Sequence, residues 1–370
     1  MKLIPFKAVY PNLDLIASSE SFFGTVKSQY VEYMKSGFFK KSESESIFVY
    51  KLDTLLSSHI GIVACTDIQD ILNGKVLKHE HTLAPKEQQM MNLMLQNQAM
   101  VKPVLLAHDS VEELEVVLND VIETKKVFLE IDFNETGEKH SFWELGDSPE
   151  AALITKIFRK NVKKCYIADG HHRVKTALIL HQTDNKNEMM DTRIESVLSI
   201  YFSWNNLSIY DFNRCVDVFQ SISPLQFLVE LSHVCKIRKM NSARKPKKKH
   251  TMTMLLYGEW YSVQWKKKVL KKHTDHPVLF DTFLLNEYVL KKIVGLEDVR
   301  DDFRVKYIDG VVGIPGLTEL VSKSENRVGF CMFPITAQNL KAVADRGLTL
   351  PPKSTWFEPR VKNGLLVKEF

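Results

Sequence analysis

The 370-residue sequence has few cysteines, and their spacing gives them no metal-binding or redox role. There is no Cys-x-x-Cys pair, because the five cysteines are scattered at positions 65, 165, 215, 235 and 331. Scattered cysteines of this kind indicate buried, reduced thiols rather than a disulfide framework. The sequence therefore predicts a cytoplasmic protein.

Long apolar runs are also missing. No stretch approaches the roughly 20 apolar residues that a membrane-spanning helix needs. Near the N-terminus, Pro5, Lys7 and Pro11 interrupt any apolar core of a signal peptide. The chain has no internal repeat and no low-complexity segment beyond two lysine runs. We therefore expect no membrane partner.

The composition is that of an ordinary globular protein, with 44% hydrophobic and 26% charged residues. The net charge of +5 is modest and lies partly in the lysine runs, so it says little about the whole surface. At roughly 100–200 residues per domain, the length predicts two domains or one elaborate domain.

Local patterns predict strands and helices without strict alternation, which favours an α+β fold over a doubly wound sheet. Ser110 begins a capping-box pattern, Ser148 precedes a helix with proline at its first position, and Asp281 is a candidate cap. The expected strands are 46–52, 59–65, 127–133, 165–168, 195–203 and a hairpin over 251–265 turning at Gly258–Glu259, and the main expected helices are 69–72, 88–98, 110–122, 174–180, 281–294 and 336–344.

The stretch 166–173 (Tyr-Ile-Ala-Asp-Gly-His-His-Arg) joins an apolar strand to a helix through a sharp turn. Gly170 has no Cβ, so the backbone can bend there and a ligand can approach closely. The unpaired N–H groups of the first helical turn favour an anion, and Arg173 adds a planar fork for two phosphate or carboxylate oxygens. The alternative is that Asp169 caps the helix and both histidines are solvated.

Glu80 lies between His79 and His81, just after the strand-like pair Val76–Leu77. A carboxylate near a substrate hydroxyl can accept its proton during phosphoryl transfer, typically a ~10²–10⁴-fold contribution. Taken alone, Glu80 is more simply a solvated strand end. On a strand, the two histidines would share a face, and with those of the turn they could bind zinc. Otherwise one histidine positions Glu80 and the others bind phosphate or water.

Together these segments resemble the family of domains of unknown function numbered 1015, which is related to the free serine kinases of the ParB/sulfiredoxin superfamily. The resemblance runs from Pro5 to near Phe370. It implies a ParB/sulfiredoxin-like core with a mixed sheet and flanking helices in residues 1–203, and a C-terminal α+β domain in 204–370 whose tail (351–360) returns to the site. The segments that carry it are Lys78–Thr82, Lys102–Ala107, Asp169–Arg173 and Pro352–Pro359.

The resemblance implies a nucleotide-dependent kinase that phosphorylates a small hydroxyl metabolite, with free L-serine as the first candidate. ADP or ATP would be the donor, with Mg²⁺ as a candidate ion. Glu80 would be the catalytic base, and Asp169 would touch the substrate or Mg²⁺. The other expected site residues are Gly170, His171, His172, Arg173, Lys353, Ser354 and Thr355 for the nucleotide, and His79, His81, Thr82 and Arg214 for the substrate.

The chain also departs from the family pattern. It lacks a Pro-Pro-Tyr-Asp-Val segment near the start, and it has Leu83 and Gln89-Met90 where the family has arginine and Asp-Arg. The free serine kinases lack those charges too, so their loss is compatible with phosphoryl transfer. It also leaves open a changed substrate, or a non-catalytic nucleotide- or anion-binding regulator. Sulfiredoxin chemistry is excluded because His171 follows the motif glycine in place of the required cysteine.

Two lysine-rich segments, 244–250 and 266–272, flank the expected hairpin. The open ends of a hairpin lie side by side, so they should form one basic patch that could bind nucleic acid. A solvated loop explains such a charge run more simply, and no helix-turn-helix pattern follows the motif. Nucleic acid is therefore a third hypothesis and not the expected partner.

Overall fold

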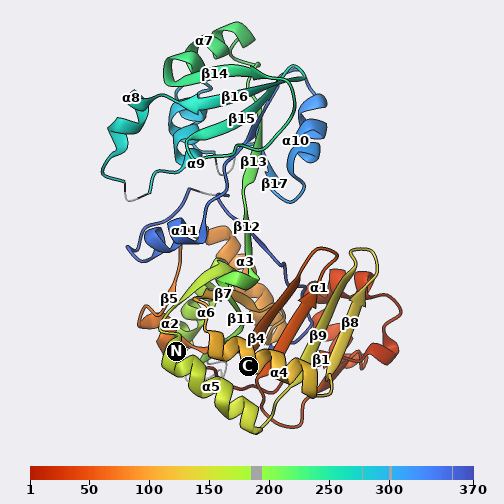
Figure 1. Ribbon diagram of the computed structural model, residues 1–370. Helices are drawn as coiled ribbons and strands as arrows, with labels where there is room; N and C mark the ends of the chain where they lie inside the picture. The colour runs from red at the N-terminus through yellow and green to blue at the C-terminus, as the bar shows by residue number, and fades with distance from the viewer. Residues whose placement is uncertain (185–193, 277, 300–301, 352) are drawn as a thin grey trace. The chain divides into compact units, whose positions relative to one another are not determined.

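The chain forms two compact units, each with its own sheet and helices (Figure 1). The first combines Met1–Ser208 with Pro359–Phe370, and the second is Ile209–Glu358. The protein is therefore α+β, as the sequence predicts, but residues 359–370 belong with the first unit instead of the C-terminal domain expected over 204–370. The computed structural model describes residues 1–184, 194–276, 278–299, 302–351 and 353–370.

The described part of the first unit contains a mixed eight-stranded sheet. Two neighbouring pairs, β10 with β5 and β11 with β7, are parallel, and the other pairs are antiparallel. The expected pair over 46–52 and 59–65 is confirmed as β3–β4. Across the sheet the strands are β5 (Val76–Leu77), β10 (Cys165–Asp169), β7 (Val104–His108), β11 (Ser196–Ser203), β4 (Ser58–Asp67), β3 (Phe48–Asp53), β9 (Glu138–Glu144) and β8 (Leu129–Phe133).

The central strands are buried along their whole length because both faces of the sheet are covered. Every residue of β11 and of β7 is buried. The edge strand β8 instead alternates buried and exposed residues, which is the pattern of a strand with one face in water. The core of this unit therefore lies at the centre of the sheet, next to β10.

The helices of the first unit mostly follow the sequence pattern. Ser148 caps α5, where its hydroxyl accepts a hydrogen bond from the N–H of Ala151, as predicted. The capping box predicted at Ser110 is wrong, because Val111 is the N-cap of α4 and the Ser110 hydroxyl donates to Glu115 instead. The helices are α1 (Ser19–Lys35), α2 (Ile68–Leu72), α3 (Ala84–Asn97), α4 (Glu112–Thr124), α5 (Pro149–Asn161) and α6 (His171–Asp184).

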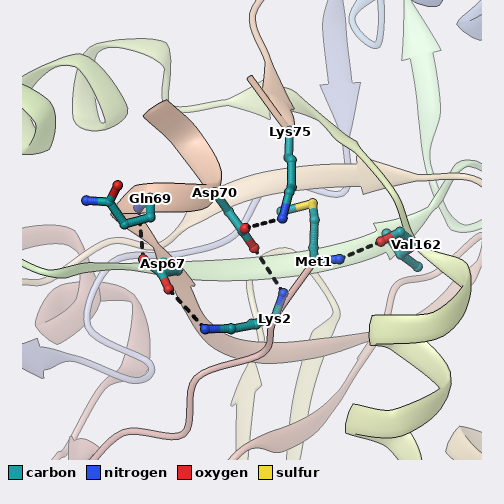
Figure 2. A network of polar contacts seen from close by, with 7 residues as sticks. All are labelled: Met1, Lys2, Asp67, Gln69, Asp70, Lys75 and Val162. Carbon is teal, nitrogen blue, oxygen red and sulfur yellow. Dashed lines mark hydrogen bonds and ion pairs between the residues drawn. The ribbon is translucent and has the colours of Figure 1, made fainter. Parts of the chain in front are cut away.

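A buried carboxylate fastens the start of the chain beside β5 (Figure 2). Asp70 of α2 accepts hydrogen bonds from Lys75 Nζ at 2.7 Å and from the backbone N–H of Lys2 at 3.0 Å. The Met1 amino group donates to the Val162 carbonyl at 2.7 Å. Burial raises the pKa of Asp70, but the hydrogen bonds from Lys75 and Lys2 hold it below its ordinary value overall. The network sets the position at which the chain enters β5.

The C-terminal segment packs into the first unit through backbone hydrogen bonds. The N–H of Gly364 donates to the Val101 carbonyl at 2.7 Å, and Val367 exchanges hydrogen bonds with Val9. Lys362 forms an ion pair with Glu138 of β9.

The short two-stranded pairs are β1 (Val9–Pro11) with β2 (Phe39–Lys41), β6 (Ala99–Met100) with β20 (Lys368–Glu369), and β12 (Ser208–Tyr210) with β19 (Trp356–Glu358).

The described part of the second unit has a six-stranded antiparallel sheet. Its strands in order are β14 (Cys235–Met240), β16 (Glu259–Trp265), β15 (Thr251–Leu256), β18 (Arg327–Cys331), β13 (Phe212–Asp217) and β17 (Val305–Asp309). Its helices are α7 (Pro224–Val234), α8 (Lys267–Leu270), α9 (Asp281–Leu284) continuing as the π-helix Leu285–Lys291, α10 (Gly313–Ser322) and α11 (Ala337–Ala344).

Two details of the second unit correct the sequence prediction. The β15–β16 hairpin turns at Tyr257 and Gly258, which both have positive φ (48° and 74°), one residue earlier than predicted. Phe280, not Asp281, is the N-cap of α9, because the Asp281 carboxylate accepts from the N–H of His250. The predicted helix over 336–344 is confirmed, with Thr336 as its cap.

The five cysteines are all buried and free, as their spacing predicts. Among the residues that the structure describes, no helix is both long and apolar enough to cross a membrane.

Candidate functional site

The predicted strand–turn–helix is confirmed, and its glycine is structurally required. Strand β10 ends at Asp169, α6 begins at His171, and Gly170 between them has φ +105°, a conformation that side chains disfavour. A Cβ on Gly170 would lie 2.7 Å from Arg173 Nη2 and 2.9 Å from its Nε. The Arg173 guanidinium is therefore folded over the bare backbone of the turn.

The Asp169 carboxylate is surrounded by positive charge. It accepts a hydrogen bond from Arg173 Nη2 at 2.6 Å, and Lys102 Nζ and Arg360 Nη1 each lie 3.8 Å from one of its oxygens. Burial raises the pKa of Asp169, but Arg173, Lys102 and Arg360 outweigh it and hold the pKa below its ordinary value. Asp169 is thus an ionised acceptor. A carboxylate so surrounded is a poor ligand for Mg²⁺, so the residues present do not fit the expected ion.

Arg173 retains hydrogen-bonding capacity for an anion. Its side chain is only 10% exposed, and one terminal nitrogen is bonded to Asp169. Its Nε is buried and has no acceptor among the residues that the structure describes. A buried guanidinium donor without a partner is costly, and an anion at the turn would satisfy it. The helix N-terminus adds the N–H groups of its first turn and its dipole.

Glu80 lies beside this turn because β5 and β10 are parallel neighbours, which places their carboxyl ends at one edge of the sheet. His171 Nδ1 is 3.7 Å from Glu80 Oε2, beyond direct hydrogen-bonding distance. The backbone N–H of His79 points at His171 Nε2 at 3.5 Å. Nε2 is then the acceptor, so the proton of the neutral ring sits on Nδ1, facing Glu80. The Glu80 side chain is 40% exposed and can be reached by a substrate.

Both buried histidines of the site are neutral at physiological pH. Burial lowers the pKa of His171 to about 3, despite the opposing charge of Asp169. Burial and the neighbouring His171 hold the pKa of His79 well below its ordinary value. Their rings meet edge to face with centroids 4.6 Å apart. They are therefore a packed neutral pair and not a phosphate-neutralising charge.

The prediction that His79 and His81 share a face is wrong. The chain leaves the strand at Leu77, so His79 is buried while His81 is exposed. Within the described ranges, no three histidine, cysteine, aspartate or glutamate side chains are placed to hold a metal ion, which removes the support for a zinc site. Thr82 and His172, which follow the ends of strands β5 and β10, are half-buried.

The remaining expected site residues belong to the second unit. Arg214 is fully buried, and its Nη1 and Nη2 donate to the carbonyls of Phe212 at 2.6 Å and Lys353 at 3.1 Å. Burial lowers the pKa of Arg214 to about 10. The expectation that Arg214 binds substrate is thus corrected: it holds the backbone of the Lys353 segment. Lys353 is exposed with φ +52°, Ser354 is buried and Thr355 half-buried, and Pro352 lies outside the described residues.

The sequence did not single out two of the cations around Asp169. Lys102 stands just before Pro103 and β7, inside the Lys102–Ala107 segment that carries the resemblance but has no predicted site residue. Arg360 follows the Trp-Phe-Glu-Pro stretch near the end of the chain. Their charge was visible, but nothing in the sequence shows that positions 102, 173 and 360 converge.

The predicted basic patch is present only in part. The open ends of the β15–β16 hairpin do adjoin, since Thr251 pairs with Gln264. Lys245, however, donates to the Gly310 carbonyl, and Lys266 donates to that of Ser232. The exposed lysines of the two segments are 247, 248, 249, 267, 268, 271 and 272.

Comparison with known proteins identifies a family. The model described as "Protein of unknown function (DUF1015)" matches residues 9–284. A search of curated proteins gives no match.

Similar solved structures are all distant. SbnI with C-terminal truncation from Staphylococcus aureus is 12% identical, with a TM-score of 0.43 over 81% of this chain and 85% of that one. A free serine kinase variant in complex with ADP is 12% identical, with a TM-score of 0.40 over 82% and 92%. A conserved hypothetical protein from Pyrococcus furiosus is 12% identical, with a TM-score of 0.40 over 83% and 95%. Likeness at this level establishes no activity.

Proposed function

The chain belongs to the DUF1015 family, and from this premise and the geometry of the site we propose that it is a nucleotide-dependent kinase for a small hydroxyl metabolite. Free serine is the first candidate acceptor, because the segments Asp169–Arg173 and Lys78–Thr82 resemble those of the free serine kinases. ADP or ATP is the proposed donor.

The observation that carries the proposal is the position of Glu80 beside the anion-binding turn. An accessible carboxylate and a buried arginine with a spare donor lie at neighbouring strand ends, and neutral His171 lies 3.7 Å from the carboxylate. Phosphoryl transfer depends mainly on positioning and charge stabilisation, and needs one acceptor for the hydroxyl proton. These residues supply each of those roles.

In the proposed reaction, the hydroxyl oxygen attacks the terminal phosphorus of the nucleotide while Glu80 accepts its proton. A new oxygen–phosphorus bond forms, and the bond from phosphorus to the bridging oxygen breaks. The negative charge left on the departing phosphate is stabilised by Arg173 and the N–H groups after Gly170. Asp169 orients Arg173 through their 2.6 Å hydrogen bond.

Several finer predictions rest on the resemblance alone and belong to the same proposal. They are a ParB/sulfiredoxin-like core around β5, β10 and α6, nucleotide binding by His172, Lys353, Ser354 and Thr355, and substrate binding by His81 and Thr82.

The test is to measure ADP and ATP binding by calorimetry and phosphoryl transfer to serine and other small hydroxyl compounds. We expect Glu80→Gln to leave nucleotide affinity unchanged and to lower the rate by ~10²–10⁴-fold, because the amide keeps the shape but cannot take a proton. Glu113→Gln, at an exposed position of α4, is the control. Unchanged turnover in Glu80→Gln would rule out Glu80 as the base. Absence of nucleotide binding would rule out the whole proposal.

A second candidate is a regulator that binds a nucleotide or anion without turning it over. It is favoured by Leu83, the N-cap of α3, and by Gln89 and Met90 within that helix, where the family has charged residues. Nucleotide binding without transfer to any acceptor in the panel would select this candidate.

A further inference from the structure

Three cations from three distant segments meet at Asp169. Arg173 comes from the first turn of α6, Lys102 from the residues before β7, and Arg360 from the C-terminal segment. The Arg173 contact is a hydrogen bond at 2.6 Å, while Lys102 and Arg360 approach the carboxylate only to 3.8 Å. The Lys102 ammonium and the Arg360 guanidinium therefore lie near this carboxylate without a hydrogen bond to it.

The fold fixes the cations in place. The carbonyl of Val101, the residue before Lys102, accepts the N–H of Gly364, which lies four residues after Arg360. Lys362 is anchored to Glu138, and Val367 pairs with Val9. The segments that carry Lys102 and Arg360 are therefore held side by side by a backbone hydrogen bond.

Lys102 is placed unfavourably unless an anion joins it. Its side chain is 24% exposed, so much of its hydration is lost. Burial and the neighbouring Arg173 lower the pKa of Lys102 to about 8, with Arg360 and Lys27 acting in the same direction and Asp169 opposing them. An added anion would offset the repulsion among these groups and supply an acceptor for the ammonium.

We propose that Lys102, Arg173 and Arg360 form a subsite for a multiply charged phosphoryl group beside Asp169, with the C-terminal segment contributing its third cation. Assigning that group to a nucleotide rests on the proposed function, whereas free pyrophosphate presents the same chemistry. Lys102 and Arg360 are then ligand-binding residues, and residues 359–370 are part of the site.

The test compares binding of ADP and of inorganic pyrophosphate to the full chain by calorimetry, with thermal melts to verify folding. We expect Lys102→Met and Arg360→Met each to weaken both ligands about tenfold or more, a loss of about 1.4 kcal/mol. Lys102→Arg keeps the charge and should retain most of the affinity. Lys156→Met, at an exposed position of α5, is the matched control and should bind as the wild type does.

The outcomes separate this subsite from the kinase proposal. If the wild type binds ADP and the two methionine variants bind it equally well, the subsite is overturned while the kinase proposal stands. If pyrophosphate binds and is weakened in both variants but ADP does not bind, the subsite stands and the kinase proposal fails. If neither ligand binds the wild type, both fail.

The pH dependence gives an independent readout. As Lys102 loses its proton above about pH 8, the wild type should lose pyrophosphate affinity relative to Lys102→Arg, whose guanidinium stays charged. An affinity ratio that stays constant from neutral pH to about pH 9 would overturn the role of Lys102.

Discussion

His171 connects the proposed base to the turn that carries the arginine. Its ring is buried, its Nε2 faces the N–H of His79, and its Nδ1 faces Glu80. An imidazole held neutral in this way can orient a carboxylate without competing for its proton. The same burial makes the residue a source of acid sensitivity.

We expect the protein to lose stability as the pH falls below about 6.5, the ordinary pKa of histidine. The unfolded chain binds a proton on His171 below that pH, whereas the folded chain does so only near its pKa of about 3. Protonation therefore favours unfolding throughout that window, and stability is fully present only above it. By about pH 5, this lowered pKa of His171 reduces the free energy of unfolding by about 2 kcal/mol.

Urea denaturation at a series of pH values measures this effect, and His171→Gln is the comparison because glutamine does not titrate. The variant should lose less free energy of unfolding than the wild type over the same range. Equal losses would show that His171 is not the responsible group.

Gly170→Ala tests whether the turn needs a bare backbone. We expect the free energy of unfolding to fall by about 1–3 kcal/mol, because alanine is strained at this positive φ. Nucleotide affinity should fall at least about tenfold, because the new Cβ would displace Arg173. Gly74→Ala is a matched control, since Gly74 also has positive φ (+70°) but its Cβ would meet nothing within 4 Å. Equal affinity losses in the two variants would contradict the contact with Arg173.

At the scale of elements, the short strand β5 positions Glu80, which follows it in the sequence, and α2 holds β5 in place. Asp70 of α2 bonds Lys75, which immediately precedes the strand. A two-residue strand has few ladder hydrogen bonds of its own, so its position depends on such neighbours.

We expect Asp70→Asn to lower the free energy of unfolding by about 1–3 kcal/mol, because a buried charged acceptor is lost. This loss of stability is smaller than the loss expected for a fully buried ion pair, because the Lys75 side chain is 45% exposed. Chemical denaturation measures it, with Asp132→Asn at an exposed position of β8 as the control. A loss no larger than that of the control would mean that the network contributes little.

At the scale of the whole molecule, the first unit is closed by residues from both ends of the chain. Leu365, Leu366 and Val367 are at most 3% exposed, and all belong to the first unit. The C-terminal segment is thus a structural part of the unit that carries the site.

Leu366→Ala should destabilise the first unit by about 2–5 kcal/mol through the buried volume it removes. Leu56→Ala, at a position 95% exposed, is the control and should have little effect. Denaturation followed by circular dichroism measures both. Wild-type stability in Leu366→Ala would contradict the packing of this segment.

Much of the fold follows from local pattern. The β3–β4 pair, the Ser148 cap of α5 and the β10–turn–α6 unit were predictable because each depends on neighbouring residues. Predictions failed where another group engaged the capping side chain: Asp281 bonds the N–H of His250, which is distant in the sequence, and Ser110 bonds Glu115 in the helix that follows it. The separation of His79 from His81 could not be predicted, because the strand ends at Leu77, before either histidine.

The sequence by itself determined the family, the α+β class and the strand–turn–helix around Gly170, because motif order, mixed periodicity and a glycine before a helix are all local properties. It also predicts Glu80 as the candidate base. Only the tertiary structure decided that His171 is neutral, that Arg214 is enclosed, and that Lys102 and Arg360 join Arg173 at Asp169. Burial and the convergence of distant charges depend on how the sheet brings its segments together, which no short stretch of sequence encodes.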